Sequence, residues 1–111
     1  MAAVLMAQRF EVFANSGKSA GNAPLLVNIQ SDLLEGLQTR VVIPLAPKDH
    51  YLKVTVPEDL MPTFTIKGRR YVLETPKLGA IPIAALKERV GSLAQHQLVI
   101  MSALDRLLHG F

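Results

Sequence analysis

The chain lacks cysteine altogether, and charged residues make up only 19% of its 111 residues. Without cysteine, a disulfide framework and a thiolate-bound zinc site are both excluded. The absence fits a reducing compartment, and we expect a cytoplasmic protein. Low charge combined with a hydrophobic share of 50% excludes an intrinsically disordered chain.

Long hydrophobic runs are missing as well. No run approaches the ~20 apolar residues of a membrane helix, so we expect no membrane partner. The apolar start, residues 1–7, is too short for the core of a signal peptide and has no basic residue before it. Positive charge is modest, because the net charge is +3 and the pI is about 9.5. These values fall short of a protein that coats nucleic acid, so we expect no direct nucleic-acid binding by the chain alone.

The length suits one domain with a modest core, which we assign to residues 1–111. Met6 is an alternative natural start to Met1, and we expect residues 1–8 to form an N-terminal extension. The hydrophobic share is high for a domain of this size, which favours self-association.

One long helical pattern is present, over residues 92–111. Ser92 followed by Gln95 predicts a capping box, and Gly110 predicts a left-handed residue that ends the helix. The predicted buried stripe has Leu104 at its centre and consists of Leu93, Ile100, Leu104 and Leu107, widened by Met101 and Leu108. The predicted exposed face consists of Gln95, Ser102, Asp105, Arg106 and His109.

Short β-rich segments fill the rest of the chain. Alternation and β-branched residues predict strands at residues 9–13, 25–32, 40–46, 63–66, 70–75 and 80–83, with a further short strand at 53–56. Pro44 and Pro47 are expected to end the third strand, and Lys67-Gly68 predicts a tight hairpin. Pro82 suits an edge strand, and residues 84–90 predict a helical turn that Gly91 stops. The predicted fold class is mostly β with one C-terminal α-helix, in a small SH3-like, antiparallel, barrel-like sheet.

Motifs for catalysis or metal binding are weak. Gly17-Lys18-Ser19 resembles the end of a phosphate-binding loop, but Val12 stands where that loop needs another glycine. The three histidines, His50, His96 and His109, lack the spacing of metal ligands, and His96 is expected on a solvated helix position. No Gly-x-Ser-x-Gly elbow is present. We therefore predict no catalytic residue, no cofactor and no metal.

A basic cluster marks the predicted hairpin. Lys67, Arg69 and Arg70 lie beside Tyr71, a combination that suits either a solvated turn or a contact with nucleic acid. The solvated turn is the better interpretation, because nothing else in the chain indicates a nucleic-acid surface.

A family resemblance emerges from the residues that follow the second predicted strand. Gln30-Ser31-Asp32-Leu33-Leu34, followed by Arg40 and Val42-Ile43-Pro44-Leu45-Ala46, resembles the CcdB family of bacterial toxins. Supporting similarities lie at Phe10-x-Val12-Phe13, Leu60-x-Pro62, Ile66-x-Gly68, Ile81-Pro82-Ile83 and the final Gly110 with one apolar residue after it. The resemblance spans residues 10–111.

The resemblance implies a homodimer with a CcdB-type barrel-like sheet and one C-terminal helix. We expect the last helix and residues 81–83 to supply much of the dimer interface. Proteins of this kind are not enzymes: they bind the A subunit of DNA gyrase, trap the cleaved-DNA complex, and are neutralised by a CcdA antitoxin. Carried onto this chain, the gyrase-binding positions are Leu33, Leu34, Asp105, His109, Gly110 and Phe111.

Three of those positions depart from the family pattern. Asp105 replaces an asparagine, His109 replaces a tryptophan, and Phe111 replaces an isoleucine. A terminal tryptophan is a typical binding hot spot, so its loss weakens the expected contact. One alternative is a homologue that keeps the dimer and antitoxin binding without gyrase poisoning. A second is a MazF-like endoribonuclease that uses His50, Arg69 or Arg70.

Overall fold

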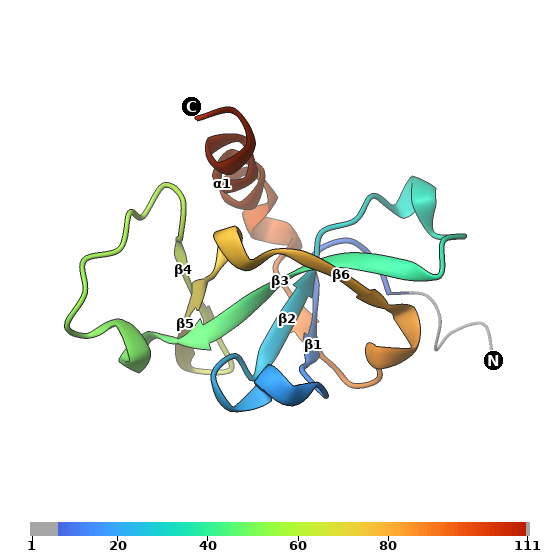
Figure 1. Ribbon diagram of the computed structural model, residues 1–111, viewed down its shortest axis with the longest axis horizontal. Coiled ribbons are helices and arrows are strands. Elements are labelled where there is room, and N and C mark those ends of the chain that lie inside the picture. The colour runs from blue at the N-terminus through green and yellow to red at the C-terminus, as the bar shows by residue number, and fades with distance from the viewer. Residues whose placement is uncertain (1–6, 111) are drawn as a thin grey trace.

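The computed structural model describes residues 7–110, which form one curled antiparallel sheet with an α-helix at the C-terminal end (Figure 1). The strands of this part of the chain are β1 (Glu11–Ala14), β2 (Leu25–Asn28), β3 (Thr39–Pro47), β4 (Thr63–Ile66), β5 (Arg69–Leu73), β6 (Gly79–Pro82) and β7 (Arg89–Ser92). The helix is α1 (Gln97–His109). The predicted fold class is confirmed.

Strand β3 is the centre of the sheet, whose order is β4-β5-β3-β2-β1-β7. One edge of β3 pairs with β2. The other edge pairs first with β6, up to Val42, and then with β5, from Leu45 onward. The strand is rich in β-branched residues, which suit a pleated, buried position.

Pro44 lies inside β3 and does not end it, so that part of the strand prediction is wrong. The carbonyl of Pro44 accepts a hydrogen bond from the Glu74 N–H at 2.9 Å, on the edge of β3 that faces β5 and β6. The missing N–H of Pro44 faces the same edge, because both groups of one residue point to the same side of a strand. Pro44 falls between the last pair with β6 and the first pair with β5, where the ladder needs no donor.

The hairpin between β4 and β5 is confirmed at the residues that predicted it. Lys67 has φ +50° and Gly68 has φ +80°, so both central residues are left-handed, as a type I′ turn requires. The resulting register pairs Thr65 with Arg70 and Ile66 with Arg69. The basic residues therefore end up at an exposed hairpin tip.

Alternate strand residues face two different cores. Val12, Val27 and Ile43 belong to the larger core, which lies between the sheet and α1. Phe13, Leu26 and Val42, each next to one of those residues, belong to the smaller core on the other face. Phe10 joins Val12 in the larger core.

Helix α1 covers the larger core with Ile100 and Ala103, both completely buried. Leu104, predicted at the centre of the stripe, is half-buried at the edge of this core. Leu108 is 66% exposed, so its assignment to the buried stripe is wrong. The predicted exposed face is confirmed at Gln95, Ser102, Asp105, Arg106 and His109.

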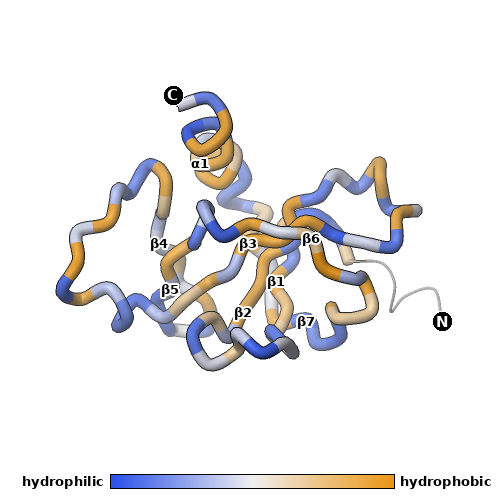
Figure 2. The backbone as a smooth tube through the Cα atoms, in the orientation of Figure 1, coloured by the Kyte–Doolittle hydropathy of each residue, from blue (hydrophilic) through white to orange (hydrophobic). Residues whose placement is uncertain are grey.

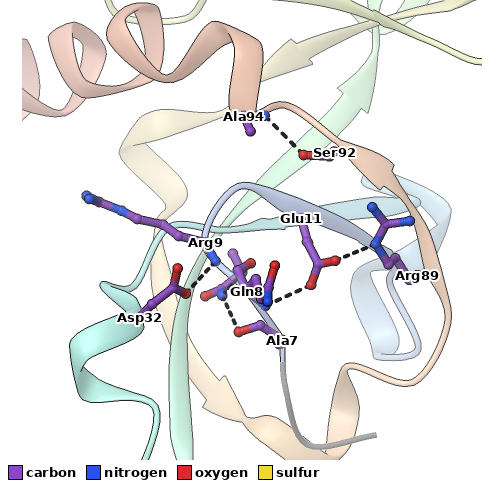
Figure 3. Close-up of polar contacts among 9 residues, drawn as sticks. Ala7, Gln8, Arg9, Glu11, Asp32, Arg89, Ser92 and Ala94 are labelled. Atoms are coloured by element: carbon purple, nitrogen blue, oxygen red, sulfur yellow. Dashed lines mark hydrogen bonds and ion pairs between the residues drawn. The ribbon is translucent and has the colours of Figure 1, made fainter. Parts of the chain in front are cut away.

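The start of α1 differs from the predicted capping box. Ser92 is the last residue of β7 and pairs with Glu11, and a 3-10 turn, Ala94–His96, intervenes before the helix. The Ser92 hydroxyl accepts a hydrogen bond from the Ala94 N–H at 3.1 Å (Figure 3). The N-cap of α1 is His96, which provides no side-chain cap, so the capping box is wrong. Gly110 is confirmed as the C-cap, with φ +81°.

Two further segments correct the sequence analysis. Residues 53–56 form no strand. The helical turn expected over residues 84–90 is limited to a 3-10 turn, Ile83–Ala85, and residues 89–92 form strand β7. The strand depends on a distant partner, because β7 pairs with β1, and the carboxylate of Glu11 bonds Arg89 across the pair (Figure 3). The sequence of residues 89–92 alone does not indicate that they pair with β1.

The folded part begins earlier than expected. Ala7 is buried in the smaller core, and its carbonyl accepts a hydrogen bond from the Asn28 side-chain amide at 3.1 Å. The same amide donates to the Gln8 carbonyl at 3.0 Å, so the predicted extension does not include these two residues. Residues 1–6 lie outside the described residues. Within residues 7–110, no helix has the length and apolarity needed to span a membrane.

Candidate functional site

The segment between β2 and β3 exposes three leucines. We call residues 31–37 the leucine loop; it contains a short 3-10 turn, Asp32–Leu34. The side chain of Leu33 is 93% exposed, Leu34 is 51% exposed and Leu37 is 52% exposed. Figure 2 shows this loop projecting from the sheet beyond β6, with apolar colour near its tip. A folded chain seldom exposes adjacent leucines in one loop unless they meet a partner.

The buried side chain of Arg40 connects the leucine loop to strand β3. Arg40, on β3, is 1% exposed. Its guanidinium donates to the carbonyl of Leu37 at 2.6 Å, to that of Thr39 at 2.9 Å, and to that of Glu35 at 2.7 Å. The planar fork of arginine allows one side chain to reach all three carbonyls. The loop is therefore fixed on the sheet.

Gln30 fixes the other end of the loop. Its amide nitrogen donates to the Leu34 carbonyl at 3.2 Å, and its amide oxygen accepts from the Val41 N–H at 3.1 Å. One buried side chain thus joins the loop to the first residues of β3.

Ser31 and Asp32 complete the frame of the loop. The Ser31 hydroxyl accepts from the Leu33 N–H at 3.2 Å and caps the 3-10 turn. The Asp32 carboxylate accepts from the Arg9 N–H at 2.8 Å (Figure 3). The side chains of the Gln-Ser-Asp pattern and of Arg40 thus all hydrogen-bond to the loop or its neighbours, and together they fix the loop that exposes Leu33 and Leu34.

Arg9 links the leucine loop to the helix. Its Nε donates to the Ile29 carbonyl at 2.9 Å, and its Nη2 lies 3.1 Å from the Met101 sulfur on α1. The guanidinium also lies 4.9 Å from the ring centre of Phe10, a cation–π distance. Phe10 itself has φ +69°, which is unusual for a residue with a side chain. The sequence analysis missed Arg9, because no local pattern indicates contacts so distant in the chain.

The end of α1 carries the other predicted site residues. Asp105 and His109 are exposed, and Gly110 continues past the helix in a left-handed conformation. The Gly110 N–H donates to the Arg106 carbonyl at 3.0 Å, and the Arg106 guanidinium donates to the Gly110 carbonyl. Phe111 lies outside the described residues. The helix end is thus held in place up to its last described residue.

The described residues of the two predicted groups lie apart within one chain. Figure 1 places the leucine loop at the side of the sheet near β6, and the end of α1 well away from it, above β4 and β5.

The sequence can now be compared with known families. A family model described as CcdB protein matches residues 9–110. The chain belongs to the CcdB family. The matched residues include the leucine loop and all of α1. Membership of this family supports the role of a toxin in a toxin–antitoxin system.

Residues with possible catalytic or metal-binding chemistry are scattered over this CcdB-family fold. Gly17-Lys18-Ser19 lies at the start of a four-residue 3-10 turn, so it lacks the long helix that a phosphate loop needs. The ring centre of His96 lies 5.1 Å from that of Phe64, and the side chain is half-buried, so its expected solvated position is wrong. No cluster of His, Cys, Asp or Glu in residues 7–110 has the arrangement of a metal site.

The basic hairpin and His50 are exposed. The guanidinium of Arg69 lies 5.9 Å from the ring centre of Tyr71, a contact that stabilises the hairpin itself. This arrangement agrees with the interpretation of a solvated turn.

Tyr51 and Glu74 form a polar contact that the sequence analysis missed. The Tyr51 hydroxyl donates to the carboxylate of Glu74, which is 4% exposed, and Lys77 lies 3.4 Å from the same oxygen. Burial, the hydrogen bond and the negative charge of Glu74 raise the pKa of Tyr51 to about 12. The contact anchors the start of the long segment between β3 and β4 on the end of β5, so its role is structural.

Proposed function

We propose that this CcdB-family chain binds the A subunit of DNA gyrase, traps the cleaved-DNA complex and is neutralised by a CcdA-like antitoxin. In this proposal it acts by binding and not as an enzyme. The observation that carries the proposal is Leu33, 93% exposed on a loop that the buried Arg40 holds in place. A preorganised apolar side chain loses little entropy on binding and suits a hot spot. The proposed gyrase contacts are Leu33, Leu34, Asp105, His109, Gly110 and Phe111.

The main test is expression of Leu33→Ser in a bacterium, followed by an assay for trapped gyrase–DNA complexes. The wild-type chain should accumulate these complexes and Leu33→Ser should not, because the contact is lost. The denaturation midpoint should stay unchanged, since the side chain is already exposed. Leu52→Ser is the matched control: Leu52 is 74% exposed but lies outside the proposed contact. Equal trapping by the two variants would refute the role of Leu33.

A second experiment addresses the departure at the helix end. His109→Trp introduces a larger aromatic surface at an exposed position of α1. We expect tighter binding to a gyrase A subunit, measured by titration calorimetry, with an unchanged circular dichroism spectrum. Unchanged affinity would indicate that this chain has another target.

The alternative is a CcdB-fold homologue that keeps antitoxin binding but has lost gyrase poisoning. The carboxylate of Asp105 and the smaller ring of His109 favour it, because both change the chemistry of a proposed contact. Under this alternative, the induced chain accumulates no trapped complexes and leaves growth unaffected. Cleavage of mRNA in the same cells would instead indicate an endoribonuclease.

A further inference from the structure

Met101, on α1, lies beside an arginine whose guanidinium forms no ion pair within residues 7–110. Met101 is half-buried and packs against the larger core. Its sulfur lies 3.1 Å from Nη2 of Arg9, so the guanidinium donates to a thioether. A thioether sulfur is only a weak hydrogen-bond acceptor. The charged donor at this point therefore faces an acceptor that uses little of its strength.

Three contacts hold Arg9 in place at the sulfur. Its Nε donates to the Ile29 carbonyl at 2.9 Å, and its guanidinium lies 4.9 Å from the ring centre of Phe10. The Arg9 backbone N–H donates to the Asp32 carboxylate at 2.8 Å. Figure 3 shows the Arg9 side chain extending away from that carboxylate. An oxygen bound to the Met101 sulfur would therefore meet a fixed, charged donor.

Oxidation of the sulfur supplies such an oxygen. When hydrogen peroxide oxidises a methionine, a sulfur lone pair attacks one peroxide oxygen, the O–O bond breaks and an S–O bond forms. The second oxygen takes the proton of the first and leaves as water, so the sulfur is oxidised to the sulfoxide and the peroxide is reduced. The product is polar, and its oxygen is a far better acceptor than the sulfur.

We propose that Met101 is an oxidation site whose sulfoxide is bound by Arg9. The sulfoxide oxygen accepts from Nη2 in place of the sulfur, and Nε keeps its bond to the Ile29 carbonyl. A charge-assisted hydrogen bond then replaces a weak one, so oxidation tightens the link between the leucine loop and α1. Both elements carry proposed gyrase contacts, so the consequence for gyrase binding rests on the proposed function.

The first test follows the modification on the full chain. After mild treatment with hydrogen peroxide, peptide mass spectrometry should find one added oxygen atom on Met101. In the ¹⁵N-labelled chain, the Nε–H resonance of Arg9 should shift, and amide exchange of residues 29–32 should slow by about three- to tenfold. A methionine sulfoxide reductase should reverse these changes. Met101 that stays reduced, an Arg9 resonance that does not move, or amide exchange that stays equal or becomes faster would overturn the proposal.

Two variants separate Met101 from the other methionines. Met101→Leu and Met61→Leu each replace a half-buried methionine by a side chain of similar volume without sulfur. Met61 is the matched control, because its side chain forms no hydrogen bond within the described residues. Peroxide should shift the Arg9 resonance in Met61→Leu as it does in the wild type, and should leave it unmoved in Met101→Leu. The same response in both variants would contradict the assigned site.

Removing the donor tests the role of Arg9. In the wild type, peroxide should raise the urea midpoint, because the sulfoxide gains a charged partner. In Arg9→Leu it should lower the midpoint, since a polar group is then left half-buried without that partner. Arg70→Leu removes an exposed arginine elsewhere and should respond as the wild type does. Midpoints that change alike in Arg9→Leu and Arg70→Leu would refute the binding of the sulfoxide by Arg9. If Arg9→Leu does not fold, the Arg9 resonance of the wild type decides the same point.

Gyrase binding separates this proposal from the function on which it rests. The oxidised wild type should bind immobilised gyrase A subunit about two- to fivefold more tightly than the reduced chain, because a more rigid frame loses less entropy on binding. Met101→Leu should show no such gain after peroxide. Equal or weaker binding by the oxidised wild type would overturn the proposed effect of the tightened link. If gyrase binds neither form, the proposed gyrase function fails, and the mass and resonance measurements still decide whether Arg9 binds an oxidised Met101.

Discussion

At the scale of single residues, Arg40 shows how a buried cation can be stabilised without a carboxylate. Buried charges are normally paired. Arg40 instead donates to three backbone carbonyls of the leucine loop and its flank. The interaction stabilises the loop and the cation at the same time, so a substitution here should affect both.

We expect Arg40→Lys to lower the free energy of unfolding by about 1–3 kcal/mol, because an ammonium cannot satisfy all three carbonyls and stays buried. Hydrogen exchange of residues 31–37 should become faster in the same variant. Arg70→Lys, at an exposed position, is the control and should change stability by less than about 0.5 kcal/mol. Unchanged exchange in Arg40→Lys would show that Gln30 and Ser31 suffice to hold the loop.

Tyr51 gives a prediction for alkaline pH. Its pKa of about 12 in the folded chain exceeds the value of about 10 in an unfolded chain. The folded state therefore retains the proton longer, and this stabilisation is complete below about pH 10 and is lost as the pH rises toward 12. Between about pH 9 and pH 11, the urea midpoint of the wild type should fall more steeply than that of Tyr51→Phe. Parallel curves would show that the contact with Glu74 does not perturb the hydroxyl.

At the scale of elements, α1 is held by fewer residues than its periodicity indicates. Ile100→Ala should cost about 2–5 kcal/mol, because it removes a completely buried side chain and leaves a cavity. Leu104→Ala should cost less, since Leu104 is half-buried, and Ser102→Ala should cost little. Denaturant midpoints measure the order. A larger loss for Leu104 than for Ile100 would contradict the placement of α1 on the sheet.

The end of α1 gives a prediction of its own. If residues 109–111 contact gyrase, deleting them should abolish gyrase binding and leave the melting temperature nearly unchanged. If Phe111 instead packs into the core, the melting temperature should fall by several degrees, since each kcal/mol shifts a domain of this size by about 4–8 °C. Differential scanning calorimetry of the truncated chain distinguishes the two.

Elements set by local chemistry were predictable, and elements set by distant partners were not. The Lys67-Gly68 hairpin and the Gly110 cap depend on left-handed residues that the sequence displays. Residues 89–92 form strand β7 because they pair with β1 at an edge of the sheet, whereas residues 53–56 pair with no strand and form none. For the candidate site, the family resemblance indicated Leu33 and Leu34, whose role stays a prediction. The link from Arg9 to Met101 joins residues 92 positions apart and was missed.

At the scale of the whole molecule, homodimer formation stays a prediction. The exposed large apolar residues that favour it lie in three places, the leucine loop, residues 52–54 and α1. Within the predicted interface segment 81–83, Ile83 is buried in its own chain and only Pro82 is exposed, so α1 is the better candidate for the interface. Light scattering at low micromolar concentration should give about twice the chain mass of 12.1 kDa. A stable mass near 12.1 kDa would refute the dimer.

The sequence by itself determined the fold class, the hairpin, the end of α1 and the family, because these follow from local backbone preference, periodicity and a contiguous motif. Only the tertiary structure decided which side chains are buried and which are exposed to solvent. Ile100 and Leu104 share one stripe of the helix, yet the position of the sheet against α1 buries Ile100 completely and Leu104 only in part. Likewise, Gln30 and Arg40 are ordinary polar residues in the sequence, and they become the frame of the leucine loop only because β2 and β3 pair beneath it.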